Sequence, residues 1–477
     1  MAHRLTRRGF LHGAATAGAA LSLPRSRAFG ANEEIQVAII GCGTMGSGHA
    51  GGFHGLPGAR VAAVSDADLE RMAAAANGLQ PTPQQHQDFR RILDDPGIDA
   101  VVIATPNHWH AAMTIMACQA GKHVYVQKPV SHSIWEGRQM VRAARKYDRI
   151  VQAGTQHRSD LALVEVGEDI RSGKYGPLQW VHTLVLHTRE SIGKVSQPQP
   201  VPDSIDYDLW CGPATKTPVM RKSFHYDWHW QWNWGDGETG NWGPHYVDDV
   251  RNVLGWDDVP TSVVAAGGRF AWSDDGETPN IHLTLMERQG VPVVVDIRNL
   301  PRGGGSTEPA EHLGLVHGNV FMCEGAAVKI QRGGGAAYDH DGNHIKQYRG
   351  NGGSHEANFI QAIRSGSRAE LKAEIEVGHL STVMCHMANI AYRVGSQATV
   401  DEVRQSMADN EEAARTLSAV VNQLDANQVD VAQFPLTLGP ALEFDPKSEQ
   451  FMGPGAAGAN RLLRNVMRKE YAIPEVV

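Results

Sequence analysis

The 477-residue chain contains little cysteine and no closely spaced pair of cysteines. Such a pattern excludes a disulfide framework and a structural zinc site, so we interpret the thiols as free and buried: Cys42, Cys118, Cys211, Cys323 and Cys385. The chain also lacks a long basic block, and its formal net charge of −8 argues against a nucleic-acid partner. It has no apolar run long enough to span a membrane after the first thirty or so residues. A chain of this length exceeds one ordinary core, and two domains are expected.

The N-terminal segment has the composition of a targeting sequence. Thr6-Arg7-Arg8-Gly9-Phe10-Leu11 precedes a short Ala-rich run that ends near Leu23. This pattern predicts a twin-arginine export signal over residues 1–31 and a periplasmic or secreted protein with no membrane insertion after processing. The alternative is an amphipathic helix that stays on the protein. Outside the cytoplasm free NAD is scarce, so an exported nicotinamide protein is expected to hold its cofactor tightly and to recycle it in place.

A glycine motif follows the first apolar run of the remaining chain. Ile35–Ile40 reads as a buried strand and leads directly into Gly41, Gly43 and Gly46 with the spacing G-x-G-x-x-G. This is the pattern of a Rossmann strand, turn and helix, in which a pyrophosphate approaches the turn. The alternative is a glycine turn in an unrelated α/β protein.

A second strand, Arg60–Ser65, ends at Asp66, where a carboxylate would bind the adenosine ribose. NAD is therefore expected and NADP is less favoured, because Asp66 would repel a 2′-phosphate. Arg71 lies nearby and is the main objection to that preference.

The order of strand and helix signals predicts an α/β fold. Residues 32–154 alternate strands with helices, as a doubly wound parallel sheet requires, and are assigned to a Rossmann domain. Residues 155–435 contain consecutive strands between Gln179 and Ile330, including Leu313–His317 and a single long strand at Val320–Ile330. These strands predict an α+β domain with a large, mostly antiparallel open sheet. Residues 436–477 are rich in proline and glycine and are expected to wrap the surface.

Five segments taken in order give the chain a family resemblance. They are Gly41–Gly46 with Asp66, Thr105-Pro106-Asn107-His108-Trp109-His110, Gln127-Lys128-Pro129, Ala153–Arg158 and Gly240–Asp248. Together they resemble the Gfo/Idh/MocA oxidoreductases, the relatives of glucose-fructose oxidoreductase and inositol dehydrogenase. The resemblance implies a nicotinamide cofactor, a carbohydrate-like substrate, and a C-terminal sheet through which such proteins often form homo-oligomers, here a dimer or tetramer.

The resemblance also assigns candidate site residues. It implies catalytic roles for Lys128, His245 and Asn241. The implied cofactor-binding residues are Gly41, Gly43, Thr44, Met45, Gly46, Asp66, Thr105, Asn107, His110, Gln127, Lys128 and Gln156. The implied substrate-binding residues are Lys128, His157, Arg158, Trp232, Asp248 and His245. No metal is implied.

Two amides stand where the family has carboxylates. The family motif Glu-Lys-Pro is Gln127-Lys128-Pro129 here, and Asp-x-x-x-His is Asn241 to His245. An amide orients a neighbouring side chain but does not stabilise an imidazolium by charge, so His245 should be a weaker base than usual. Carboxylates that would restore a charge are Asp236, Glu238, Asp248 and Asp249. A pseudoenzyme is the alternative.

The implied chemistry needs a base and a cation beside the reacting carbon. His245 suits the base that takes a hydroxyl proton, and Lys128 suits the cation that stabilises the alkoxide. Without the resemblance, a capped core histidine and a surface lysine would be the better interpretations.

An unusually aromatic run occupies His225–Trp234. If this segment is extended, His225, Asp227 and His229 share one face and the tryptophans share the other. The preferred interpretation is a wall that stacks on a sugar ring; a core element, a subunit interface or a zinc site of the three polar residues are the alternatives.

Three functions fit these observations. The first is an exported NAD-dependent oxidoreductase acting on a sugar or sugar derivative. The second is a glycoside hydrolase in which the cofactor transiently oxidises a ring hydroxyl, the glycoside is eliminated, and the hydride is returned. The third is a non-catalytic sugar-binding protein. Net NADH formation indicates the first, aglycone release without net NADH the second, and binding alone the third.

Overall fold

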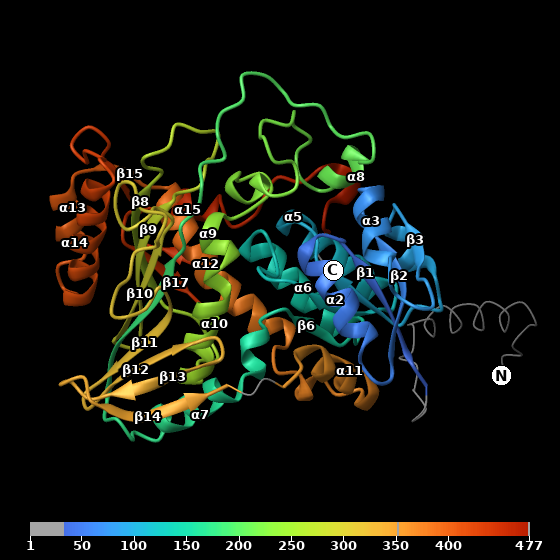
Figure 1. Ribbon diagram of the computed structural model, residues 1–477, viewed down its shortest axis with the longest axis horizontal. Coiled ribbons are helices and arrows are strands. Elements are labelled where there is room, and N and C mark those ends of the chain that lie inside the picture. The colour runs from blue at the N-terminus through green and yellow to red at the C-terminus, as the bar shows by residue number, and fades with distance from the viewer. Residues whose placement is uncertain (1–32, 351–352, 476–477) are drawn as a thin grey trace, which may run out of the picture.

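Two β-sheets organise the computed structural model, which describes residues 33–350 and 353–475 (Figure 1). The predicted export signal lies outside the described residues. The first sheet is six-stranded, runs in the order β3-β2-β1-β4-β5-β6, and is parallel throughout. Its strands are β1 (Ile35–Ile40), β2 (Ala59–Ser65), β3 (Gln84–His86), β4 (Ala100–Ile103), β5 (His123–Val126) and β6 (Val151–Ala153). The predicted Rossmann topology is confirmed.

Helices connect these strands in the expected alternation. They are α2 (Thr44–His54), α3 (Leu69–Ala76), α4 (Arg90–Asp94), α5 (Asn107–Gln119) and α6 (Ile134–Lys146). The chain leaves β1 toward β2 on one side and returns through β4 on the other, so strand order reverses between β1 and β4. Ligands of open α/β sheets bind beyond the carboxyl ends of the strands at such a point.

The second sheet has twelve strands and is mostly antiparallel, as predicted. Its path is β14-β13-β12-β11-β7-β10-β9-β8-β16-β15, with β17 and β18 attached beside β8. The central strands are β7 (Leu178–Leu186), β8 (Ser262–Gly268), β9 (Ile281–Arg288), β10 (Val291–Arg298) and β11 (His317–Cys323). The remaining strands are β12 (Ala327–Gln331), β13 (Gly334–Tyr338), β14 (His344–Arg349), β15 (Ser396–Ala398), β16 (Leu436–Leu438), β17 (Leu442–Asp445) and β18 (Gln450–Met452). β10 runs parallel to β7.

Two of the predicted strands in this region are wrong. Residues 299–316 run as a loop before β11, so Leu313–His317 is not a strand. The single strand expected at Val320–Ile330 is instead β11 and β12, separated by a turn. Backbone N–H groups at Glu324 and Gly325 donate to the carbonyls of Pro177 and Tyr175, so a contact with a distant segment holds the turn.

Helices cover both faces of the second sheet (Figure 1). Helices α7 (Leu161–Arg171), α10 (Gly243–Leu254) and α12 (Ile375–Arg393) share a core with the face turned toward the first sheet. Helices α13 (Val400–Ser406) and α14 (Glu411–Ala426) pack on the opposite face, which we call the outer face, around Leu417 and Val420. The sheet is therefore buried on both sides where α14 crosses it.

Later parts of the chain return to the first sheet. Helix α11 (His355–Ser365) places Phe359 against Phe53 and Tyr125, with ring centroids 6.2 and 5.8 Å away. Residues 436–452 add strands to the second sheet, whereas Tyr471 near the C-terminus packs on Trp109, 5.1 Å between ring centroids. None of the described helices combines the length and hydropathy that a membrane span needs.

Candidate active site

A cavity of about 670 Å³ opens at the carboxyl edge of the parallel sheet, where strand order reverses. Predicted cofactor residues that line it are Gly41, Gly43, Thr44, Met45, Asp66, Thr105, Asn107, His110, Gln127, Lys128 and Gln156. The opposite wall comes from the rest of the chain and includes Asn241 and His245. Its volume falls in the range of sites for small molecules and cofactors.

The glycine turn between β1 and α2 has the geometry that a pyrophosphate requires. Gly41 has a φ of +91°, and a Cβ there would lie 2.6 Å from the carbonyl oxygen of Ala104. A Cβ on Gly46 would lie 1.7 Å from the carbonyl oxygen of Gly41, so only glycine at position 46 lets the helix pack this closely against the turn. Gly43 precedes α2 without a side-chain cap, which leaves the first N–H groups of the helix for an anion. The turn therefore fits the pyrophosphate of a dinucleotide.

Asp66 follows β2 and lies beside this turn. Its carboxylate accepts hydrogen bonds from the backbone N–H groups of Cys42, at 2.6 Å, and Asp68, at 2.9 Å. Burial raises the pKa of Asp66, and these two hydrogen bonds oppose that rise. Arg71 also lines this end of the cavity, and a Cβ on Gly43 would lie 2.9 Å from its guanidinium. The carboxylate keeps lone pairs for ribose hydroxyls, and Arg71 lies within the same end of the site.

Gln127 belongs to a chain of side chains that sequence reasoning did not find. Its amide nitrogen contacts His49 Nε2, and His49 Nδ1 lies 3.2 Å from Glu356 Oε1. The hydrogen bond from His49 is the main reason that the pKa of Glu356 falls to about 2. A glutamate at position 127 would put a second carboxylate on the same imidazole. Gln127 stands where the family motif has an acid. In this chain the carboxylate beside His49 comes instead from Glu356 on α11.

Lys128 follows β5 and lines the cavity. Its ammonium donates a hydrogen bond to the backbone carbonyl of Asn241, 2.5 Å away, at the end of α9 (Gly237–Asn241). Burial lowers the pKa of Lys128 to about 8, and the nearby Glu238 carboxylate opposes the shift. The ammonium is therefore protonated at neutral pH, but its pKa lies closer to neutrality than that of an ordinary lysine.

His245 lies in the first turn of α10 and faces the same cavity. Its ring stacks on His157, with centroids 4.8 Å apart and planes 21° apart, and its Nδ1 is buried with no hydrogen-bond partner among the described residues. Burial, then the charges of Lys128 and His157, hold its pKa well below the usual value. His245 is therefore a neutral imidazole at physiological pH and can accept a proton.

The carboxylates considered as partners of His245 are held elsewhere. Asp236 accepts from the Asn107 amide at 2.8 Å, and Glu238 pairs with Arg189 at 2.8 Å. Asp248 pairs with Arg158 at 2.8 Å and accepts from Ser381 at 2.6 Å.

Asp249 does not contact His245 directly but acts on it through His157. Its carboxylate lies 3.0 Å from His157 Nδ1, and although burial opposes it, this contact raises the pKa of His157. In the described part of the chain no hydrogen bond joins the Asn241 and His245 side chains, so Asn241 contributes its backbone carbonyl to Lys128 instead.

The structure divides the predicted substrate residues into two groups. Lys128 and His245 line the cavity, and His157 supports His245 from behind. Arg158 and Asp248 form a buried ion pair between η1 (Gln156–Ser159) and α10, outside the cavity lining. Trp232 lines a separate, smaller cavity of about 130 Å³.

The aromatic segment is not extended, so the expected common face of its polar residues is wrong. Asp227–Trp230 forms a 3₁₀ helix, η2. His225 bonds to the Asp68 carboxylate at 2.9 Å, and Asp227 accepts from the backbone N–H of Ser223.

His229 bonds to the carbonyl of Tyr226 and stacks on Trp228, with ring centroids 3.7 Å apart. The three polar residues of the zinc alternative thus have separate partners. His225, Tyr226, Trp228 and His229 line the large cavity, whereas Trp234 packs in the core beside Trp210.

Sequence reasoning also missed Arg332. Arg332 lies in the turn that connects β12 to β13, and it lines the cavity. No local signal shows where this hairpin lies, because the pairing of distant strands and the bond from the Gly333 N–H to Asp160, at the start of α7, put it beside the cavity.

Comparison with known proteins gives two domain matches. Residues 35–155 match the Gfo/Idh/MocA model described as "Oxidoreductase family, NAD-binding Rossmann fold". Residues 186–300 match the model described as "Oxidoreductase family, C-terminal alpha/beta domain" of the same group.

Individual relatives agree with these matches. The chain is 34% identical over 157 residues to inositol 2-dehydrogenase 1 of Saccharopolyspora erythraea, covering 32% of this chain and 47% of the relative. It is 29% identical over 167 residues to a glycosyl hydrolase family 109 protein of Shewanella pealeana, covering 32% and 36%. The chain thus spans about half or less of the length of these curated relatives.

Among solved structures, the WlbA dehydrogenase of Bordetella pertussis, in complex with NADH and UDP-GlcNAcA, has a TM-score of 0.56 at 20% identity. The match covers 75% of this chain and 94% of that structure, which is a likeness of fold.

Proposed function

The chain belongs to the Gfo/Idh/MocA oxidoreductase family, with an NAD-binding Rossmann domain, and on that premise we propose that it transfers hydride between a sugar-like carbinol and tightly held NAD. One observation carries the proposal: Lys128 and His245 face the same cavity as the glycine turn and Asp66. The site thus combines a dinucleotide cradle, a cation and a neutral imidazole. The inositol 2-dehydrogenase relative supports a polyol or sugar as the substrate class.

Each residue of the site has a separate role in the proposed oxidation. NAD, when bound, supplies the acceptor for the hydride that leaves the carbinol carbon. Lys128 binds the hydroxyl oxygen and stabilises the negative charge that develops on it. His245, kept neutral by burial and then by the charges of Lys128 and His157, accepts the hydroxyl proton. His157 and Asp249 position the His245 ring, and the wall formed by Tyr226, Trp228 and His229 is placed to exclude water and to stack on a ring.

NAD rather than NADP is proposed for the adenosine end of the site. Asp66 would repel a 2′-phosphate, and it is anchored to the glycine turn at Cys42, which leaves it little freedom to withdraw. Arg71 is the group that would favour NADP. Mass spectrometry of the nucleotide released from purified, denatured protein distinguishes the two, and a predominance of NADP would overturn this assignment.

One assay separates the proposed function from its closest alternative. The full chain is incubated with inositols and free sugars, and with aryl glycosides, while absorbance at the NADH band and aglycone release are both followed. Net NADH with a free polyol or sugar is the expected result. Aglycone release without net NADH would instead identify a redox-neutral glycoside hydrolase, an alternative that the family 109 relative supports. Binding of sugars with neither product would contradict both and indicate a non-catalytic protein.

Export and assembly are proposed on separate grounds. Arg7 and Arg8 support export by the twin-arginine route to the periplasm or beyond. The expected result is that Arg7→Lys with Arg8→Lys retains the protein in the cytoplasm, and continued export of this variant would refute the route. A homo-oligomer, either a dimer or a tetramer, is expected from light scattering after size exclusion, and a monomer would refute it.

A further inference from the structure

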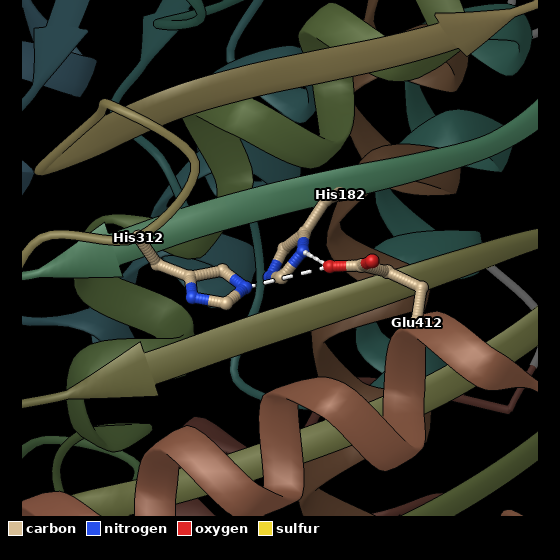
Figure 2. A group of neighbouring side chains, drawn as sticks. All are labelled: His182, His312 and Glu412. Carbon is tan, nitrogen blue, oxygen red and sulfur yellow. Dashed lines mark hydrogen bonds and ion pairs between the residues drawn. The ribbon is translucent and has the colours of Figure 1, made fainter.

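A compact group of metal-ligating side chains lies on the outer face of the second sheet, away from the large cavity. His182 comes from β7, His312 from the loop before β11, and Glu412 from α14, and Figure 2 shows the three converging. We call these residues the outer-face cluster. His182 Nδ1 lies 2.9 Å from Glu412 Oε1, and His312 Nε2 lies 3.4 Å from the same oxygen. One ligand atom from each residue lies within 4.8 Å of the others.

Local structure explains why these side chains meet. Along β7, Val181 and Val185 point into the inner core, and His182 between them points to the outer face. On α14, the apolar residues from Ala413 onward pack on that face, and Glu412 in the first helical turn lies next to this contact surface. The loop before β11 then brings His312 over His182, with ring centroids 5.1 Å apart.

The cluster is almost closed to solvent and is left partly without partners. The side chains of His182, His312 and Glu412 are 0%, 15% and 1% exposed. Glu412 Oε2 is buried with no hydrogen-bond partner in the described structure, and its contact with Arg415 is 3.6 Å long. Glu412 Oε2 thus has a long ion pair with Arg415 but no hydrogen bond, and together with the two imidazoles the carboxylate provides ligand types that suit a transition-metal ion.

A second carboxylate lies on the other side of the His182 ring. Asp296 Oδ2 on β10 lies 3.6 Å from His182 Nε2, and Arg298 holds Asp296 through a hydrogen bond of 2.8 Å to its other oxygen. Histidines that bind metals usually donate their other ring N–H to a carboxylate. Here Asp296 faces Nε2 at ion-pair distance, and Nε2 has no hydrogen-bond partner among the described residues. Without an ion, His182 Nδ1–H donates to Glu412 Oε1 at 2.9 Å, so an ion bound at Nδ1 would take the place of this proton while Nε2 keeps the proton that faces Asp296.

We propose that the outer-face cluster binds a divalent ion of the zinc class through His182 Nδ1, His312 Nε2 and the Glu412 carboxylate. Two imidazoles and a carboxylate favour zinc over magnesium or calcium, which prefer oxygen ligands, and water would complete a tetrahedral shell. The site does not contribute to the lining of the large cavity, so the ion is structural. It ties α14 and the loop before β11 to the centre of the sheet, and it is independent of the proposed redox function.

The test uses the full chain, stripped with EDTA and titrated with Zn²⁺ alone in a calorimeter. We expect one tightly bound Zn²⁺ per chain and a rise in the thermal midpoint on loading. Co²⁺ is then used as a spectroscopic probe, and we expect visible bands of a low-symmetry, four- or five-coordinate nitrogen–oxygen site. NAD binding should be the same with and without Zn²⁺.

Matched variants tie the binding to the cluster. His312→Ala should lower Zn²⁺ affinity by about 100-fold or more, because it removes one of three protein ligands. Glu412→Gln keeps the side-chain shape and should also weaken binding and abolish the Co²⁺ bands. His344→Ala is the control, since it removes an exposed histidine from β14, and it should bind Zn²⁺ as the wild type does.

Two results would overturn the proposal. One is the absence of stoichiometric Zn²⁺ binding to folded wild-type protein, which would make the cluster a purely hydrogen-bonded network. The other is equal affinity in wild type, His312→Ala and Glu412→Gln, which would place the ion elsewhere. If His312→Ala does not fold, His312→Asn preserves a polar side chain on the same loop and gives the same readout.

Discussion

Two pairs of neighbouring histidines lie on opposite sides of the second sheet, and one member of each pair, His245 and His182, has its pKa shifted in the opposite direction from the other. In the cavity, His245 stacks on His157, and burial with the charges of Lys128 and His157 lowers the pKa of His245. On the outer face, His182 lies beside His312 between the carboxylates of Asp296 and Glu412. There the carboxylates overcome burial and raise the pKa of His182.

The comparison shows that the surroundings of a buried histidine decide its role. A histidine among cations is kept neutral and can take a proton from a substrate, whereas a histidine among carboxylates is held in place as part of a polar network. Burial alone does not separate the two cases. The sign of the neighbouring charge does.

The largest expected effect is on turnover in the cavity. Lys128→Ala and His245→Ala should each reduce kcat by about 10²–10⁴-fold, since each removes a positioned cation or proton acceptor. Bound NAD and the thermal midpoint should change little, which mass spectrometry and calorimetry would check. His344→Ala is the control for the loss of a histidine as such. Near-normal turnover in His245→Ala would move the base to another residue.

On the outer face the expected effect is on stability. His182→Ala, measured in EDTA, should lower the free energy of unfolding by about 3 kcal/mol, because it leaves two buried carboxylates without their shared partner. Urea denaturation measures the change against wild type and His344→Ala. A loss no greater than that of the control would show that the network around His182 is not needed for the fold.

A smaller effect is expected on the pH dependence of the cavity. His157→Gln removes the ring whose charge lowers the pKa of His245, and it keeps an N–H donor for Asp249. The pKa of His245 should then rise, and since the base acts when deprotonated, the acidic limb of kcat/KM should move up by about one pH unit. Activity below neutrality should fall. If the acidic limb stays at the same pH as in the wild type, the charge of His157 does not affect the pKa of His245.

The smallest expected shift comes from Asn241→Asp. A carboxylate four residues before His245 should raise its pKa, so the acidic limb again moves upward, but by less than in His157→Gln. The reason is that the Asn241 contact seen here is a backbone bond to Lys128, and not a side-chain bond to His245. A pH profile identical to wild type, with NAD still bound, would show that the pairing implied by the family motif does not hold in this chain.

Local sequence patterns predicted much of the first half of the molecule. The apolar strand before Gly41, the acid at Asp66 and the short motif at Lys128 are close in sequence to the elements that present them, so each predicts its own placement at a strand end. The antiparallel character of the second sheet also followed from consecutive strands without helices between them.

Contacts between distant segments escaped the same reasoning. Glu356 reaches His49 from α11, Arg332 reaches the cavity from a hairpin, and the turn at Gly325 is held by residues near Tyr175. The aromatic run was misread because η2 curls where alternation suggested a strand. None of these contacts has a periodicity or a spacing that marks it.

The sequence by itself predicted the family resemblance, the nicotinamide cofactor class and two candidate residues, Lys128 and His245, and both of them line the large cavity. Only the tertiary structure decided what surrounds them: His157 and Asp249 behind His245, a backbone carbonyl on Lys128, and an amide at Gln127 matched to a carboxylate from α11. The physical reason is that residue type fixes which protons and charges a side chain can carry. Its pKa and its partners depend on burial and on charges brought near by the fold, and these come from parts of the chain far away in sequence.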